Sequence, residues 1–211
     1  MYLGRIVAIG LTPEGNAAAM YRVSSRSFPN REAIKTAAGI AIVPKAGHEN
    51  DLRKNPYIAY NCLRTAGKYV LTSNGSQTDP IIEKIAMGMP VRDAFALGLL
   101  AMDYEKDSLD TPRIVACIGN GDTAGYLGIV RKNAVLVREF ELQPGQLFYI
   151  STYECNFPCD CFTDVKFDAV DAASACKYVI NGGVFEDFTN PVTAAYAVWK
   201  NGELDIATLD A

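Results

Sequence analysis

The segment 21–31 carries a dense set of side chains that can bind anions. It holds three arginines and three serines: Arg22, Ser24, Ser25, Arg26, Ser27 and Arg31. Guanidinium groups form paired hydrogen bonds with phosphate oxygens, and neighbouring hydroxyl groups add further donors. This composition predicts a phosphate-binding loop. A solvated loop with ordinary arginines is the alternative interpretation.

Further polar residues that could handle a substrate lie at or near predicted strand and helix ends: Tyr60, Asn61, Lys68, Asn74, Gly75, Asp103 and Glu105. The two acids follow a nearly all-apolar helical stretch, so we expect them at the edge of a buried layer. Burial raises the pKa of a carboxyl group and can fit it for proton transfer near neutral pH. Two solvated carboxylates at a helix end are the alternative.

The residue inventory restricts other kinds of chemistry. The only histidine, His48, lies in a polar loop, so we expect it to be solvated, and catalytic triads or multi-histidine zinc sites are disfavoured. Cys155, Cys159 and Cys161 follow a C-x3-C-x-C pattern, which differs from the paired knuckles of structural zinc sites. We therefore expect reduced thiols and no metal.

The composition is that of a globular protein with an uneven charge distribution. Of its 211 residues, 49% are hydrophobic and 21% are charged, which suits one domain spanning 1–211. Residues 1–138 contain all but three of the 20 lysines and arginines, whereas residues 139–211 contain half of the 24 acidic residues. An anionic ligand is therefore expected in the first two thirds. Nucleic acid is disfavoured, because the pI is near 5.1 and no basic run occurs.

The sequence contains no recognisable targeting or membrane segment. Its first residues lack the basic start and long apolar run of a signal peptide. No stretch approaches the roughly 18 apolar residues of a transmembrane helix. We expect a soluble cytoplasmic protein.

The functional residues must be positioned by strands at both ends of the chain and by helices in the middle. Strands are predicted at 3–10, 17–25, 39–43, 58–63, 69–72, 113–118, 125–131, 134–140 and 147–153, with a helix as the alternative at 58–63. Asn201-Gly202 favours a tight turn between further strands at 192–200 and 203–209. Helices are predicted at 80–87, 90–102 and 168–179, and the second is apolar around most of its surface, which predicts that it is enclosed between layers. This order indicates an α+β fold with stacked antiparallel sheets.

Several long segments together resemble the archaeal-type IMP cyclohydrolase family. They are MYLGRIVAIG at 1–10, YRVSSRSFPNRE at 21–32, NPYIAYNCLR at 55–64, TSNGSQTDPI at 72–81 and MDYEKDSLDTPRI at 102–114, with LFYISTYE at 147–154 also fitting. The resemblance implies a four-layer αββα sandwich like that of Ntn hydrolases. It also implies the last step of purine synthesis, in which 5-formamidoimidazole-4-carboxamide ribotide closes its ring, loses water and becomes IMP.

This reaction lets us assign expected roles to the residues in the resembling segments. The carboxamide nitrogen attacks the formyl carbon of the same molecule, so we expect no metal or redox cofactor. We expect Glu105, with Tyr60 or Lys68, to move protons, and Asp103 to orient Lys68 or bind ribose. The expected phosphate ligands are Arg22, Ser24, Ser25, Arg26 and Arg31, and the expected ligands of the base and carboxamide are Asn61, Asn74 and Gly75.

Two other functions remain open on the sequence. One is a catalytically silent protein that binds purine nucleotides, and the other is an Ntn-type amide hydrolase with Cys62 or Cys117 as nucleophile. An N-terminal nucleophile is not expected, because removal of Met1 would leave Tyr2. The expected partner is a small purine ribonucleotide, without nucleic acid or membrane, and exposed strand edges lead us to expect a homo-oligomer.

Overall fold

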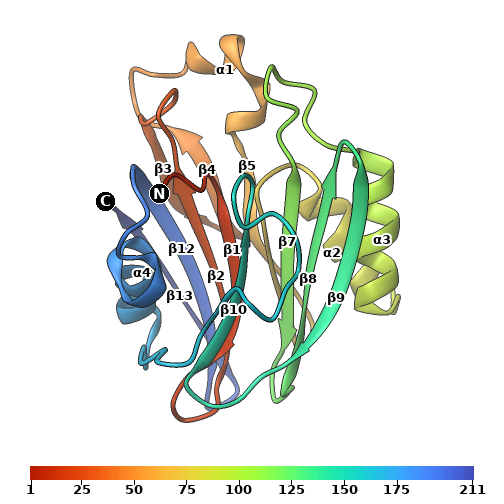
Figure 1. Ribbon diagram of the computed structural model, residues 1–211. Helices are drawn as coiled ribbons and strands as arrows, with labels where there is room; N and C mark the ends of the chain where they lie inside the picture. The colour runs from red at the N-terminus through yellow and green to blue at the C-terminus, as the bar shows by residue number, and fades with distance from the viewer.

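Two antiparallel β-sheets stacked face to face form the centre of the molecule, in a computed structural model that describes residues 1–211 (Figure 1). Sheet A contains, in spatial order, β11 (Thr163–Asp164), β10 (Gln146–Ser151), β1 (Ile6–Leu11), β2 (Ala17–Ser24), β12 (Pro191–Lys200) and β13 (Glu203–Asp210). Sheet B contains β3 (Arg31–Thr36), β4 (Gly39–Pro44), β5 (Tyr60–Ala66), β6 (Tyr69–Ser73), β7 (Arg113–Gly119), β8 (Ala124–Arg131) and β9 (Ala134–Glu141).

Helices cover the outer face of each sheet. Helix α4 (Ala172–Asn181) packs on sheet A, and α2 (Thr78–Ala86) and α3 (Val91–Met102) pack on sheet B (Figure 1). Helix α1 (Asp51–Lys54) and a following 3-10 turn, Pro56–Ile58, lie at one end of the sandwich, and a second such turn, Gly183–Phe185, follows α4. The predicted α+β fold with four αββα layers is confirmed.

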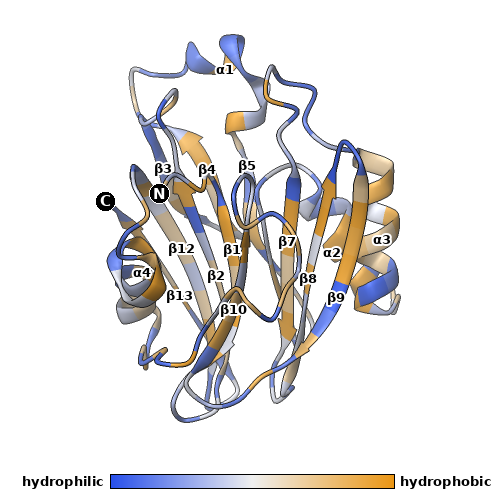
Figure 2. Cartoon of the chain, in the orientation of Figure 1, coloured by the Kyte–Doolittle hydropathy of each residue, from blue (hydrophilic) through white to orange (hydrophobic).

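Three apolar cores hold the four layers together. The largest lies between the sheets, a second lies between sheet A and α4, and a third lies between sheet B and the pair α2 and α3. Strand β1 serves two of them, because Val7 and Ile9 point into the first core while Ile6 and Ala8 point into the second. Side chains alternate along a strand, so a central strand of a four-layer fold is apolar on both faces. Figure 2 shows this apolar colouring along the stacked strands.

Helix α3 is not enclosed between layers, so that prediction is wrong. It belongs to the outermost layer, where Leu97 is 49% exposed and Leu100 is 67% exposed. Only the inner face of α3 packs against sheet B and α2. Gly98 allows the close approach to α2, since a Cβ at this position would lie 2.3 Å from Cγ1 of Ile81. None of the helices combines the length and the apolar composition that a membrane span requires.

Strand β3 is an addition to the predicted elements, because the sequence predicts no strand between 25 and 39. It pairs along its whole length with β4, from Arg31 opposite Pro44 to Thr36 opposite Gly39. Charged side chains in REAIKT obscure the alternation, and only its first part faces the core. This edge position lets Arg31 point inward beside the functional residues described below.

Candidate active site

A cleft of about 440 Å³ opens at the end of the sandwich where α1 lies. Its walls come from loops that are far apart in the sequence: Tyr2 and Arg5 before β1, Ser25 to Phe28 after β2, Lys54 to Tyr57 around α1, Lys106 to Leu109 after α3, and Tyr153 after β10. Both sheets therefore contribute to the cleft. Its walls carry more basic than acidic side chains, which favours an anionic ligand.

A buried ion pair joins Arg5, which lines this cleft, to Glu105, which lies behind the lining. Nη2 of Arg5 donates to Oε2 of Glu105 at 2.9 Å, and the side chains are 13% and 1% exposed. Burial raises the pKa of Glu105 above its usual range, while the charges of Arg5 and Arg113 oppose that rise. The other oxygen of Glu105, Oε1, is buried and has no hydrogen-bond partner. A buried carboxylate oxygen without a partner is suited to accept a proton.

The position of Arg5 depends on a tight contact between the start of the chain and the end of β10. The Arg5 amide donates to Oγ1 of Thr152 at 3.2 Å, and the Thr152 amide donates to the Arg5 carbonyl at 3.0 Å. Gly4 makes this contact possible, because it has a φ of +74° and a Cβ there would lie 2.2 Å from Thr152 Oγ1.

Two tyrosines form a buried hydroxyl pair near Arg5. The hydroxyl oxygens of Tyr21 on β2 and Tyr60 on β5 lie 2.6 Å apart, so each sheet contributes one of them. Burial raises the pKa of Tyr60, against the opposing charges of Arg31 and Arg5. Burial also raises the pKa of Tyr21 well above its usual value. Both hydroxyls are therefore protonated at neutral pH and can donate hydrogen bonds.

Arg31 keeps most of its donors free. Its Nε donates to the Phe28 carbonyl at 3.0 Å, and its terminal nitrogens make no hydrogen bond to the protein. The side chain is buried, and its charge acts on Tyr60. Buried guanidinium groups with unused donors are suited to binding an anion or a carbonyl group.

Arg113, at the start of β7, approaches the same region. Its Nη1 donates to Oε1 of Gln77 at 2.8 Å, and its Nε is buried without a partner. Gly75 makes room for it, because a Cβ at this position would lie 2.5 Å from Nη1. Asn74 is committed to the turn before α2, since its Oδ1 accepts from the amide of Ile114 at 2.7 Å and from Nε2 of Gln77 at 2.9 Å.

Ser25 and Arg26 line the cleft, as a phosphate loop requires. Oγ of Ser25 accepts from the Phe28 amide at 3.0 Å, which shapes the loop. The Arg26 guanidinium stacks over the ring of Tyr2 at 4.1 Å and forms no ion pair. Its hydrogen-bond donors therefore remain available to a ligand.

Arg22 and Ser24 do not reach the cleft, and their predicted role as phosphate ligands needs correction. Nε of Arg22 donates to Oγ of Ser24 at 2.9 Å, and its terminal nitrogens donate to four main-chain carbonyls at and beyond the end of α4, those of Val179, Ile180, Phe185 and Phe188. Burial lowers the pKa of Arg22 to about 10. Side chains alternate along β2, so Arg22 points to α4 whereas Tyr21 points between the sheets.

Lys68 lies at the opposite end of the sandwich from Glu105 and cannot be its proton-transfer partner. Its Nζ pairs with Asp122 at 2.6 Å, and its side chain lies beside Gly119, at the far end of β7 from Arg113. Seven strand residues span roughly 20 Å. The predicted pairing of Lys68 with Asp103 fails for the same reason.

Asn61 and Asp103 do not line the cleft, and each is held by a nearby charged residue. Nδ2 of Asn61 donates to Asp79 of α2 at 3.0 Å, beside an ion pair between Arg64 and Asp79 at 2.7 Å. Asp103 pairs with Lys106 on the surface, and this hydrogen bond lowers the pKa of Asp103. Neighbouring side chains on a strand point to opposite faces of the sheet. Tyr60 points toward sheet A, so Asn61, the next residue on β5, points toward the helix layer.

The residues that sequence reasoning missed are Arg5, Arg113, Tyr21 and Tyr153. Arg5 and Arg113 are isolated basic residues, and no local spacing distinguishes them. The available signal was their membership of the segments 1–10 and 102–114, both of which carry the family resemblance. Tyr153 stacks on Tyr2 with ring centroids 5.8 Å apart, and it lies in the later resembling segment 147–154.

Cys159 and Cys161 form a disulfide, which corrects the expectation of reduced thiols at these two positions. Their Cα atoms are 5.2 Å apart, a separation that a disulfide can bridge. Cys155 is buried and free, so the three cysteines do not converge as one set of ligands. His48 is exposed, as predicted.

Comparison with known proteins gives consistent matches along the chain. Residues 2–203 match the sequence profile of IMP cyclohydrolase-like proteins. An IMP cyclohydrolase of Methanosphaera stadtmanae is 47% identical over 201 residues, covering 95% of this chain and 96% of the relative. One from Methanococcus aeolicus is 43% identical over 211 residues, covering 99% and 100%, and one from Halobacterium salinarum is 48% identical over 177 residues, covering 84% and 83%.

Proposed function

The chain belongs to the family of IMP cyclohydrolase-like proteins, and on that premise we propose that its cleft converts 5-formamidoimidazole-4-carboxamide ribotide into IMP. The observation that carries the proposal is the buried pair of Arg5 and Glu105 beneath a cationic cleft. The cleft suits the phosphate of a ribotide, and the pair below it supplies a carboxylate with one unused oxygen.

The phosphate is assigned to the outer wall of the cleft. Arg26 has no anionic partner there, and the hydroxyl of Ser25 lies on the same loop. Lys54 and Lys106 also line the cleft and form only exposed ion pairs, whose net contribution to stability is small. A dianionic phosphate can therefore replace their carboxylate partners at little cost.

The chemistry requires bond formation between two groups that the substrate already holds side by side. The carboxamide nitrogen bonds to the formyl carbon, and the formyl oxygen becomes a hydroxyl group on a tetrahedral carbon. That hydroxyl then leaves as water, while the carboxamide nitrogen and the formamido nitrogen have each given up one proton. Fixing the two groups in a reactive geometry can supply several kcal/mol of the rate enhancement.

Glu105 is proposed to carry these protons. Its carboxylate, whose ionised form the charge of Arg5 favours against burial, accepts the carboxamide proton at Oε1 and returns a proton to the departing hydroxyl. The protonated hydroxyl of Tyr60 and the free donors of Arg31 then stabilise negative charge on the formyl oxygen. Glu105 thus keeps its predicted role as a proposal. Tyr60 is now proposed to stabilise charge instead of moving protons, and Arg5 takes the place of Lys68 as the partner of Glu105.

Two alternatives fit the geometry less well. An amide hydrolase that uses Cys62 or Cys117 would need a reactive thiolate, yet both thiols are fully buried and burial raises their pKa values. A buried carboxylate with one unpaired oxygen lowers the stability of the fold. A protein that only binds a nucleotide gains nothing in return for that cost.

Exposed strand edges and an exposed helix face bear on the oligomeric state of the protein. We propose a homo-oligomer, because the edge strands β3, β9 and β13 and the apolar outer face of α3 remain exposed. Sedimentation of the purified chain above the 22.9 kDa of one copy would support it, and a monomer at micromolar concentration would overturn it. The cytoplasmic location and the absence of a nucleic-acid partner stay predictions.

The function is tested by incubating the purified protein with the formylated ribotide and separating the products. We expect IMP without release of formate. Tight IMP binding without turnover would identify a silent binding protein, and formate with the unformylated ribotide would identify an amide hydrolase. Either result would overturn the proposal.

A further inference from the structure

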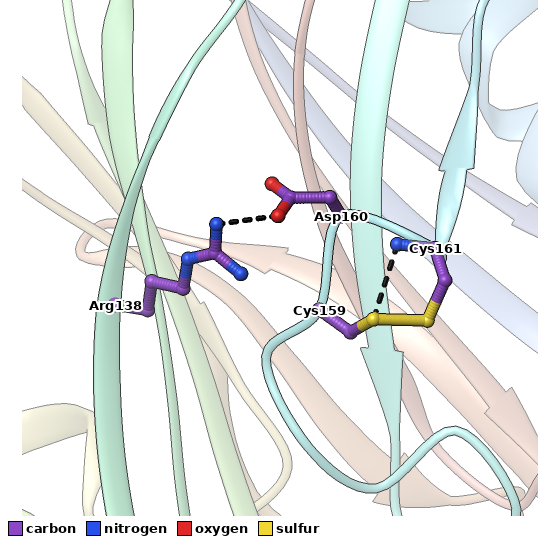
Figure 3. The surroundings of a disulfide bond; sticks show 4 residues. All are labelled: Arg138, Cys159, Asp160 and Cys161. Carbon is purple, nitrogen blue, oxygen red and sulfur yellow. Dashed lines mark hydrogen bonds and ion pairs between the residues drawn. A yellow bond between two sulfur atoms is a disulfide. The ribbon is translucent and has the colours of Figure 1, made fainter.

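The loop between β10 and β11 carries a disulfide that the proposed reaction does not use. Cys159 and Cys161 are joined there on either side of Asp160 (Figure 3). The other four cysteines are free and buried: Cys62, Cys117, Cys155 and Cys176. We propose that Cys159 and Cys161 form a reversible thiol–disulfide exchange site for dithiols, and that the oxidised form holds this loop as a strap between the two sheets.

The disulfide is poorly placed to stabilise the fold. A disulfide constrains the unfolded chain more strongly when it closes a longer loop, and here the two cysteines are only two residues apart. It also joins no second element of the structure, because both sulfurs belong to one surface loop. Its chemistry, rather than cross-linking of the fold, is therefore the property that the structure can use.

The two sulfurs differ in a way that gives exchange a direction. Cys161 is exposed, whereas Cys159 is half-buried. The amide of Cys161 donates to Sγ of Cys159 at 3.1 Å, as Figure 3 shows. A hydrogen bond from an amide stabilises negative charge on sulfur, so Cys159 is the better leaving thiolate and Cys161 the more accessible sulfur for attack.

The exchange follows from this difference. A thiolate of an external dithiol bonds to Sγ of Cys161, the bond between the cysteines breaks, and its electron pair passes to Sγ of Cys159. The second thiol of the reagent then attacks the mixed disulfide, which releases Cys161. Cys159 and Cys161 gain two electrons and two protons in all, and the dithiol becomes its cyclic disulfide.

The same loop bridges the two sheets. Asp160 accepts from Nη2 of Arg138 on β9 at 2.6 Å, and Asn156 accepts from Nη1 of Arg131 at the end of β8 at 2.8 Å. Figure 3 shows Arg138 reaching Asp160 from sheet B, beside the disulfide. Because both neighbours of Asp160 are fixed by the S–S bond, oxidation holds this carboxylate toward Arg138, and reduction releases it.

Native alkylation tests the exchange site, since the four other cysteines are buried. The folded protein is treated with N-ethylmaleimide before and after dithiothreitol, and added mass is measured. We expect no label before reduction and two labels after it, and none at any stage in a Cys159→Ser/Cys161→Ser variant. Equal labelling of the wild type before and after dithiothreitol, at either zero or two, would overturn the proposal.

Limited proteolysis tests the strap without requiring enzymatic turnover. Phe162, next to Cys161 in this loop, is half-buried and is followed by Thr163, so it is a site for chymotrypsin when the loop opens. We expect the double serine variant, which stands for the open form, to be cut there several-fold faster than the oxidised wild type. An Asp160→Asn variant with its disulfide intact should also be cut faster. Equal rates for wild type and double variant would overturn the strap, and neither result depends on IMP formation.

Discussion

Among the single residues of the site, Arg5 has the largest influence on the charge of Glu105. Burial raises the pKa of Glu105, and the charge and hydrogen bond of Arg5 oppose that rise. The folded pKa is above the unfolded value, so the stability that Glu105 contributes is present at low pH and is lost as the pH rises through the folded pKa. Arg5 limits this loss and keeps the carboxylate available as a base.

Replacement of Arg5 should therefore move the pH profile of turnover. In Arg5→Gln the opposing charge is gone, so the acidic limb of the kcat profile should shift to higher pH by about one to three pH units. Arg5→Lys keeps the charge and should leave the limb near its wild-type position. The measurement is kcat between pH 5 and pH 9 for the three proteins. An unmoved limb in Arg5→Gln would remove Arg5 from the control of Glu105.

Arg26 should contribute to binding rather than to chemistry. It lines the cleft without an ion pair, so Arg26→Ala should weaken IMP binding about ten-fold while kcat changes little. Arg53→Ala is the matched control, because Arg53 is exposed on α1 and does not line the cleft. Calorimetric titration with IMP measures both. Equal affinities of the two variants would exclude Arg26 as a phosphate ligand.

At the scale of elements, the arginine-rich segment divides between two tasks. The carbonyls in the last turn of a helix have no hydrogen-bond partner within the helix. Arg22 donates hydrogen bonds to such carbonyls at the end of α4. Arg26 lies beyond the end of β2 and faces the cleft. Sequence could identify the segment but not this division, because it depends on which face of β2 a helix covers, and that helix lies about 150 residues later in the chain.

Arg22→Ala should therefore destabilise the fold. The substitution leaves buried carbonyls unpaired, and we expect the free energy of unfolding to fall by about 3 kcal/mol or more. Arg22→Lys should recover only part of it, since one ammonium group cannot reach all four carbonyls. Urea unfolding followed by circular dichroism measures the change. Full stability combined with weak IMP binding would return Arg22 to the phosphate site.

Most of the elements were predictable from local patterns. Asn201-Gly202 indicated the hairpin of β12 and β13, and Pro90 marked the start of α3 correctly. The outward exposure of Leu100 was not predictable, because an apolar helix surface does not say whether another layer covers it. The disulfide escaped prediction too, since the spacing of Cys159 and Cys161 does not report whether the thiols are oxidised.

At the scale of the whole molecule, the site exists only because the two sheets stack. Arg5 and Tyr21 come from the sheet A side, and Glu105 and Tyr60 come from the sheet B side. The cleft is lined by residues of the basic first part of the chain, apart from Tyr153. The predicted preference of an anionic ligand for this part therefore agrees with the cleft, whereas the acidic part mainly completes sheet A and its helix.

The most direct test of this arrangement is single-turnover ring closure by Glu105→Gln, measured together with its affinity for IMP. Glutamine keeps the shape and can still accept a hydrogen bond from Arg5, but it cannot accept a proton. We predict a rate of IMP formation lower by about 10²–10⁴-fold, with the dissociation constant of IMP within about three-fold of the wild type. Unchanged turnover in this variant would contradict the central claim that the buried carboxylate carries the protons of ring closure.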